Sequence, residues 1–272
     1  MSPQLTSRVY PLRLPLIPDE EKGWKRYPIF DGFTADLRTL SCHVSVLTQH
    51  RCPHPPHRHD EEEILLLLAG EVDLILPDMQ PPNGEPRKRL RRGEFVYYPP
   101  QFSHTLQTVG EDPANYLMFK WYNHGSATGT DSRLAFGHFT LCAPAEKSEV
   151  EAGSRRRLVF EGPTACLRRL HCHASTLTPA AGYEPHSDDY TVAIIVLEGE
   201  VETLGERAGP HGVIFYSAGE PHGMRNRGET TARYVVFEFH GRRRALLGKF
   251  TDPQYWKRNL KHLVRGFGGR AQ

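Results

Sequence analysis

The stretch PPHRHDEEEILLLLAG (55–70) holds two histidines one residue apart, a run of carboxylates and an apolar segment that ends in glycine. Both a charged loop leading into a buried strand and a metal site at the start of that strand fit this pattern. His57 and His59 alternate in an extended segment, so their side chains point to the same face. Glu63 opens the apolar run and shares a face with the leucines at every second position after it. A carboxylate on such a face must be paired, protonated or bound to a metal.

The remaining acidic residues of this stretch, Asp60, Glu61 and Glu62, are expected to face solvent at the turn before the strand. A fourth ligand should come from a distant strand that barrel closure brings back, and His104 is the natural candidate because it follows an apolar run and a Pro-Pro turn. Three imidazoles and one carboxylate suit Fe(II), Mn, Ni, Zn or Cu rather than Mg or Ca. This set would leave one or two positions of an octahedral ion open for substrate, water or O2.

The sequence contains two copies of one unit. LRTLSCHVSVLT (37–48) and LRRLHCHASTLT (167–178) share eight of twelve residues in register. Three more segments match in the same order: ILLLLAGEVDLI (64–75) with AIIVLEGEVETL (193–204), GEFVYYPPQFSH (93–104) with GVIFYSAGEPH (212–222), and NYLMFKWY (115–122) with RYVVFEFH (233–240). Such a series indicates a tandem duplication of about 120–130 residues.

The matched segments are short, rich in β-branched and aromatic residues, and bounded by Gly, Pro, Asn or Asp, which predicts an all-β barrel or sandwich in each copy. The best helix candidate is 253–267, where Pro253 suits a first turn and apolar residues gather on one face. The predicted division is an N-terminal extension (1–34), an N-terminal barrel with the metal site (35–125), a linker with connecting strands (126–160), a C-terminal barrel with a degenerate site (161–242) and a helical tail (243–272).

These motifs resemble those of the cupin superfamily, and the duplication resembles a bicupin. The first cupin motif, G(X)5HXH(X)3-4E(X)6G, is matched from His57 to Gly70 except for its leading glycine. The second, G(X)5PXG(X)2H(X)3N, is matched from Gly93 to Thr108, with Gln101 and Thr108 in place of its Gly and Asn. The resemblance covers roughly residues 35–240. It implies a double-stranded β-helix barrel in each half and a metal bound by the motif residues His57, His59, Glu63 and His104.

The second copy departs from this ligand set. His186 and Asp188 stand where the first copy has its two histidines, Val192 replaces the glutamate, and His222 matches the last histidine. Two interpretations compete. We favour a barrel that has lost its metal and serves dimerisation and stability. The alternative is a His-x-Asp…His triad that holds iron, as in oxygenases that share this barrel topology.

Other polar residues of the barrels are candidates for secondary roles. His43 and His173 occupy the same place in both copies and either project toward the cavity or bond to the backbone of the core. Four residues of the first copy are candidates for acid–base chemistry, substrate anchoring or an aromatic cavity wall: Lys120, Tyr122, Tyr97 and Tyr98. No catalytic role is assigned to a particular residue.

Composition narrows the possible partners. A formal net charge of +2 implies no strong attraction to nucleic acid, and no apolar stretch is long enough to span a membrane. Five cysteines without a CxxC pair indicate neither a disulfide framework nor a thiolate zinc site, so a reduced cytoplasmic setting is expected. The expected partners are a small-molecule substrate and, because barrel edges are exposed, a second copy in a homodimer.

The family resemblance does not fix the reaction, because this fold supports many chemistries. The first hypothesis is an Fe(II) dioxygenase that uses one divalent metal ion per chain and acts on a small organic substrate. The second is a non-redox isomerase, lyase or polyketide-type cyclase with Zn, Mn or Ni. A non-catalytic ligand-binding bicupin is the third, although the complete ligand set and the lack of a helix-turn-helix pattern argue against it.

Overall fold

The computed structural model describes residues 2–79, 86–123, 133–141, 149–151 and 153–241. Every regular element in these ranges is a β-strand, so the all-β class with two tandem cupin barrels is confirmed. The predicted C-terminal helix, 253–267, lies outside the described residues, as does the rest of the 243–272 tail. No helix that could cross a membrane occurs in the part of the chain that the structure describes.

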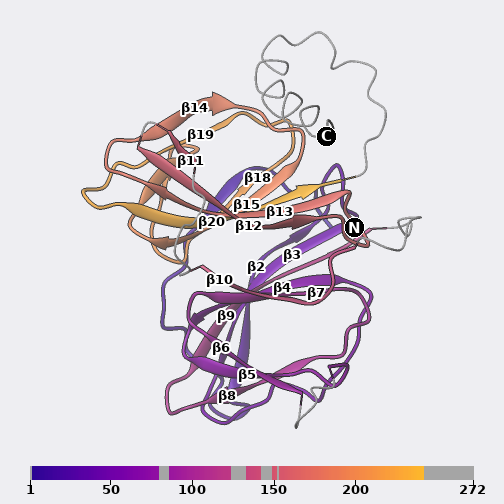
Figure 1. The fold of residues 1–272 in the computed structure, drawn as a ribbon. Helices are drawn as coiled ribbons and strands as arrows, with labels where there is room; N and C mark the ends of the chain where they lie inside the picture. Colours follow the sequence, from indigo (N-terminus) through magenta and orange to yellow (C-terminus); the bar gives the residue numbers. More distant parts are fainter. Residues whose placement is uncertain (1, 80–85, 124–132, 142–148, 152, 242–272) are drawn as a thin grey trace, which may run out of the picture. The chain divides into compact units, whose positions relative to one another are not determined.

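The N-terminal repeat forms two sheets that face each other (Figure 1). The larger has the order β10-β7-β4-β9-β3-β2 and the smaller the order β6-β5-β8. Their strands are β2 (Trp24–Gly32), β3 (Thr39–Leu47), β4 (Glu62–Ala69), β5 (Glu71–Ile75), β6 (Arg87–Arg91), β7 (Glu94–Tyr98), β8 (Thr105–Val109), β9 (Ala114–Tyr122) and β10 (Gly137–Thr140). All pairings are antiparallel, as expected for a barrel of this type.

The C-terminal repeat has the same two-sheet plan. Its larger sheet has the order β1-β18-β15-β20-β13-β12-β11 and its smaller sheet β14-β19-β16-β17. The strands are β1 (Arg8–Tyr10), β11 (Glu149–Glu151), β12 (Ser154–Gly162), β13 (Arg169–Leu177), β14 (Gly182–His186), β15 (Thr191–Glu198), β16 (Val201–Thr203), β17 (Glu206–Ala208), β18 (Val213–Tyr216), β19 (His222–Arg225) and β20 (Ala232–His240).

The two repeats exchange their first strands. β1, near the N-terminus, pairs with β18 of the C-terminal repeat, and β10, after the first barrel, pairs with β7 of the N-terminal repeat. The structure therefore differs from the predicted boundaries. β2 fell in the predicted extension and β12 in the predicted linker, yet both are full members of the larger sheets. These two strands carry weaker sequence patterns, because only part of each strand is buried.

Burial on both faces of β4 explains its unbroken apolar sequence. Leu65 and Leu67 face the interior of the N-terminal barrel, whereas Ile64 and Leu66 join a core that also contains side chains of the C-terminal repeat. Strands buried on both faces read as continuous hydrophobic runs rather than as alternation. Gly70 then turns the chain with φ +76, and a Cβ there would lie 2.8 Å from the Cα of Ala114.

Candidate metal centre

The structure brings the four candidate ligands together at one end of the N-terminal barrel. His57 and His59 lie in the loop before β4, Glu63 on β4, and His104 at the residue before β8. The nitrogens that the three histidines offer lie within 4.8 Å of one another. Oε2 of Glu63 is 3.1 Å from Nε2 of His59, and its Oε1 is 3.7 Å from Nε2 of His104.

Backbone contacts hold the histidine rings in place. The main chains of His57 and His104 exchange two hydrogen bonds of 3.2 Å, which ties the loop to the start of β8. Nδ1 of His59 lies 3.0 Å from the carbonyl oxygen of Glu61, and Nδ1 of His104 lies 2.9 Å from that of Phe102. A carbonyl can only accept, so each Nδ1 carries the proton and each Nε2 presents its lone pair to the centre.

Glu63 is fully buried, and one of its neighbours is a lysine. Nζ of Lys120, on β9, lies 3.0 Å from Oε2 of Glu63. Burial alone would raise the pKa of Glu63, but the close contact with the His59 ring and the charge of Lys120 lower it to about 2. Burial lowers the pKa of His104 and takes that of His57 to about 4. At neutral pH the group therefore offers the carboxylate of Glu63 and the neutral imidazoles of His57 and His104, which are the forms that bind metals.

Two observations support a metal fit. Oε1 of Glu63 and Nδ1 of His57 are buried and have no hydrogen-bond partner. Such groups are rare in native proteins, and a bound ion is one of the explanations for them. The donor set of imidazoles and one carboxylate matches divalent transition metals. The residues present therefore fit a metal ion.

The two candidate tyrosines of β7 point in opposite directions. Tyr98 stacks on His104 with ring centroids 4.1 Å apart and an interplanar angle of 11°. Tyr97 faces the other side of the sheet, where its hydroxyl donates to Oε1 of Glu62 over 3.1 Å. Only Tyr98 therefore belongs to the candidate centre. Tyr122, two residues beyond Lys120, is half-buried.

The position of Glu62 differs from the one expected from the sequence. It was expected to face solvent, but its side chain is fully buried against the C-terminal repeat. The carboxylate accepts hydrogen bonds from Thr164 Oγ1 at 2.8 Å and from the amide of Ala165 at 2.6 Å, and the indole N–H of Trp121 also donates to it. Burial raises the pKa of Glu62, and these bonds oppose the rise. The residue joins the two repeats rather than facing water.

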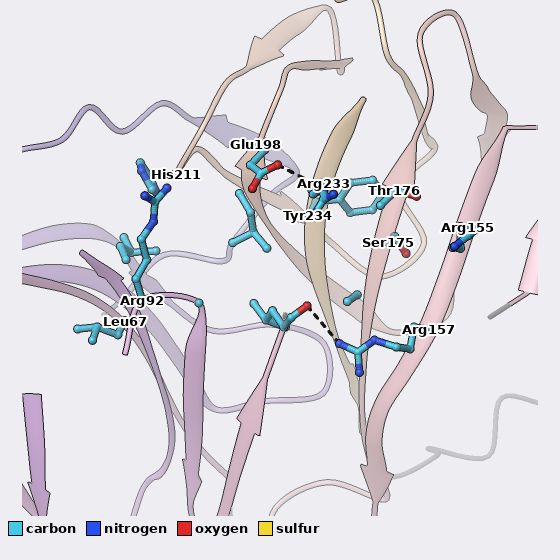
Figure 2. Close-up of a pocket in the computed structure, with 15 residues that line it drawn as sticks. Leu67, Arg92, Arg155, Arg157, Ser175, Thr176, Glu198, His211, Arg233 and Tyr234 are labelled. Carbon is cyan, nitrogen blue, oxygen red and sulfur yellow. Dashed lines mark hydrogen bonds and ion pairs between the residues drawn. The ribbon is translucent and has the colours of Figure 1, made fainter. Parts of the chain in front are cut away.

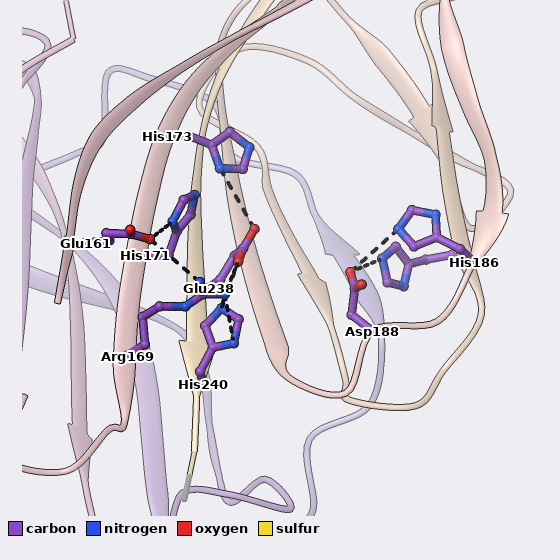
Figure 3. Close-up of polar contacts among 9 residues, drawn as sticks. Glu161, Arg169, His171, His173, His186, Asp188, Glu238 and His240 are labelled. Carbon is purple, nitrogen blue, oxygen red and sulfur yellow. Dashed lines mark hydrogen bonds and ion pairs between the residues drawn. The ribbon is translucent and has the colours of Figure 1, made fainter. Parts of the chain in front are cut away.

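The corresponding group of the C-terminal repeat also converges (Figure 3). Oδ2 of Asp188 lies 3.6 Å from Nε2 of His186 and 3.4 Å from Nε2 of His222. Tyr216 stacks on His222 at 3.9 Å, as Tyr98 does on His104. Val192, in the place of the glutamate, is a buried apolar residue of the barrel. Whether this triad holds a metal stays a prediction.

His43 and His173, at equivalent strand positions in the two repeats, have different surroundings. His43, on β3, is buried but is not one of the residues that converge in the N-terminal centre. His173, on β13, instead converges with His171 and Glu238 in a third group of potential ligands, which the sequence did not indicate. Glu238 is aligned with Lys120 of the first repeat. Because the two residues have opposite charges, the alignment did not indicate a metal ligand at this position.

A cavity of about 430 Å³ is lined by none of the residues of these groups (Figure 2). Side chains of both repeats line it, among them Arg92, Arg157, His211 and Tyr234. None of the four candidate ligands contributes to it, so this cavity is separate from the candidate centre.

Comparison with known proteins supports the cupin fold. Residues 44–120 match the cupin domain family. A putative glyoxylate induced protein from Pseudomonas aeruginosa superposes over 91% of this chain and 94% of its own, with a TM-score of 0.67 and 12% identity. The chain has the fold of a bicupin, with two tandem cupin barrels.

Two further solved structures share this fold. AerE from Microcystis aeruginosa matches 80% of the chain and 99% of its own, with a TM-score of 0.56 and 14% identity. A mutant of oxalate decarboxylase from Bacillus subtilis matches 87% and 78%, with a TM-score of 0.57 and 10% identity. These identities establish the fold and not the activity. No curated protein matches the sequence.

Proposed function

We propose that the N-terminal cupin is a metal-dependent enzyme site for a small organic substrate, held together by His57, His59, Glu63 and His104. The observation that carries this proposal is the fully buried Glu63, whose Oε1 has no hydrogen-bond partner and lies 3.7 Å from Nε2 of His104. We choose Fe(II) as the ion, with Zn, Mn and Ni as alternatives, and dioxygenation as the reaction. In that reaction both oxygen atoms of one O2 enter one substrate molecule.

The bound ion would supply Lewis acidity and, as Fe(II), the electrons that activate O2. The protein supplies the rest. The bonds from His59 and His104 to backbone carbonyls fix both rings with Nε2 facing inward. Tyr98 closes one side of His104 and keeps water from that ring. Because Lys120 is half-buried and lies next to Glu63, its ammonium can pair with an anionic substrate group.

Lys120 also favours a second candidate reaction, a non-redox lyase or isomerase step. An ammonium beside the metal ligands can bind a substrate carboxylate or hold the proton that such a reaction moves. One of the structures similar in fold is an oxalate decarboxylase from Bacillus subtilis, described with Mn(II) centres. That protein is similar in fold only, so the argument for this chain depends on Lys120.

One experiment distinguishes dioxygenation from the non-redox reaction. Purified full-length protein is analysed for metal content, loaded anaerobically with Fe(II) or Mn(II), and given a panel of small carboxylic acids while O2 uptake and product are followed. Dioxygenation predicts one O2 consumed for each product molecule with Fe(II). Turnover without O2 would contradict the dioxygenase and support the non-redox reaction.

Glu63→Gln combined with His104→Ala is the matched test of the site itself. Both reactions predict that this double variant loses bound metal and turnover. Glu111→Gln, at an exposed position, serves as the control. Retained turnover in the double variant would rule out metal catalysis at this centre.

A further inference from the structure

A third group of potential metal ligands lies in the C-terminal cupin, away from the cupin motifs (Figure 3). His171 and His173 alternate on β13, so both side chains leave the same face of the sheet. Glu238, on the neighbouring strand β20, is the direct cross-strand partner of His171. Ligand atoms of these three residues lie within 4.8 Å of one another.

His171 has the support that metal-binding histidines usually have. Its Nδ1 lies 2.9 Å from Oε2 of Glu161, on the adjacent strand β12. The carboxylate accepts a hydrogen bond from Nδ1–H, and this leaves Nε2 of His171 with a lone pair. A carboxylate behind the imidazole fixes the ring and increases the basicity of the ligating nitrogen.

His173 and Glu238 complete the arrangement. His173 is 4% exposed, and its buried Nδ1 has no hydrogen-bond partner although it lies 3.9 Å from Oε1 of Glu238. The other oxygen of Glu238 is 2.8 Å from Nε2 of His240. Oε2 of Glu238 is therefore oriented by His240. Oε1 faces the buried Nδ1 of His173 at a distance too long for a hydrogen bond.

The N-terminal cupin lacks this group at the aligned positions. Ser41 stands where His171 is, His43 where His173 is, and Lys120 where Glu238 is. The positive charge of Lys120 opposes a cation there. In the C-terminal cupin, Val192 on β15 stands at the position of Glu63. The carboxylate of this strand pair is instead Glu238, on β20. The duplication has thus produced two different sets of possible ligands in equivalent barrels.

We propose that His171, His173 and Glu238 bind a divalent transition metal of the zinc class, at a site separate from His186, Asp188 and His222. Two imidazoles and one carboxylate with an open position are a known zinc donor set. Zinc bonds of about 2.0–2.2 Å at tetrahedral angles place ligand atoms about 3.4 Å apart. The long contact between His173 and Glu238 needs to close by roughly half an ångström to reach this geometry.

The test uses full-length protein in which Glu63→Gln and His104→Ala remove the N-terminal centre. Equilibrium dialysis against Zn(II), followed by elemental analysis, measures bound ions per chain. The proposal predicts one zinc ion in this background. Adding Glu238→Gln should weaken its binding at least 100-fold, and Glu161→Gln should weaken it about tenfold, because Glu161 only orients His171.

Matched controls separate the alternatives. Asp188→Asn tests the motif triad, and His43→Gln tests the histidine aligned with His173; neither should change zinc binding in the same background. Loss of the ion in Asp188→Asn would place it in the motif triad and overturn the proposal. So would zinc that persists at full affinity in Glu238→Gln, or a background protein that binds none.

Glu161→Gln tests whether weaker zinc binding results from a defect in folding. The Glu161 side chain is 44% exposed, so its amide variant keeps the packing of the sheet. A circular dichroism melt should be unchanged while zinc affinity falls. Unchanged affinity in this variant would contradict a ligand role for His171.

Discussion

Nζ of Lys120 lies 3.0 Å from Oε2 of Glu63 and 3.4 Å from Nε2 of His59. The ammonium therefore lies beside two of the proposed metal ligands. Glu63 and Lys120 are cross-strand partners on β4 and β9, and their counterparts in the other cupin, Val192 and Glu238, are partners on β15 and β20. One barrel has a Glu–Lys pair at this place; in the other, Glu238 lies 4.0 Å from the guanidinium of Arg169 and has no lysine opposite it.

Replacing Lys120 separates its effect on metal binding from its effect on substrate. A monovalent and a divalent cation a few ångströms apart repel by several kcal/mol even at an effective dielectric constant of about 20. We expect Lys120→Met to tighten Zn(II) binding about tenfold, allowing for solvent and relaxation. It should also raise KM for an anionic substrate. A chelator competition assay measures the first effect, with Lys22→Met, an exposed lysine, as the control. Weaker metal binding in Lys120→Met would show that the lysine organises the ligands instead of competing with the ion.

The lowered pKa of Glu63 predicts a pH dependence of stability in the metal-free protein. Its pKa is about 2 in the folded chain against an ordinary 4.5. A group whose pKa is lowered by folding stabilises the protein above its unfolded pKa, and this contribution disappears as pH falls toward the folded pKa. We therefore expect metal-free wild type to lose more stability than Glu63→Gln between about pH 4.5 and pH 2. Urea unfolding at a series of pH values gives both curves. Parallel curves would show that Glu63 keeps an ordinary pKa.

The sequence predicted the convergence of the N-terminal centre because its geometry is mostly local. An extended backbone places His57 and His59 on one face, and a carboxylate that leads an apolar strand must point inward with it. Barrel closure then brings His104 back, as the antiparallel bridge between His57 and His104 shows. The metal itself and the reaction stay predictions.

What the sequence could not give depends on contacts between the repeats. Glu62 was expected at the surface because it lies next to the apolar run, at a turn that normally meets water. The continuous run from Ile64 to Leu68 already indicated burial on both faces, and Glu62 shares a face with Ile64. The exchange of β1 and β10 between the repeats has no local signal, since strands of three or four residues carry too little pattern.

Glu62 therefore gives a stability prediction that involves both cupins. Its carboxylate accepts from Thr164 and Ala165 of the C-terminal cupin and from Tyr97 of its own. In Glu62→Gln, the NH2 of the new amide would replace a carboxylate oxygen and face hydrogen-bond donors. Both the NH2 and these donors would then be buried without an acceptor. We expect a loss of about 2–4 kcal/mol in urea unfolding. Glu111→Gln, exposed to solvent, should stay within about 0.5 kcal/mol of wild type. A similarly small change for Glu62→Gln would mean that the carboxylate adds nothing to the contact between the cupins.

Two substitutions can convert the Val192–Glu238 pair of the C-terminal cupin to the Glu–Lys pair of the N-terminal cupin. Val192→Glu alone buries a second carboxylate opposite Glu238, and an uncompensated buried charge costs about 3–5 kcal/mol. Glu238→Lys alone places an ammonium among His171, His173 and His240, and should also destabilise. Together they restore the Glu and Lys of the first repeat, so the double variant should be more stable than the sum of the single effects by at least about 1 kcal/mol. Thermal unfolding of the four proteins without metal measures this coupling. Additive losses would mean that the strand register, although aligned in both barrels, does not bring the two side chains into contact as it does for Glu63 and Lys120.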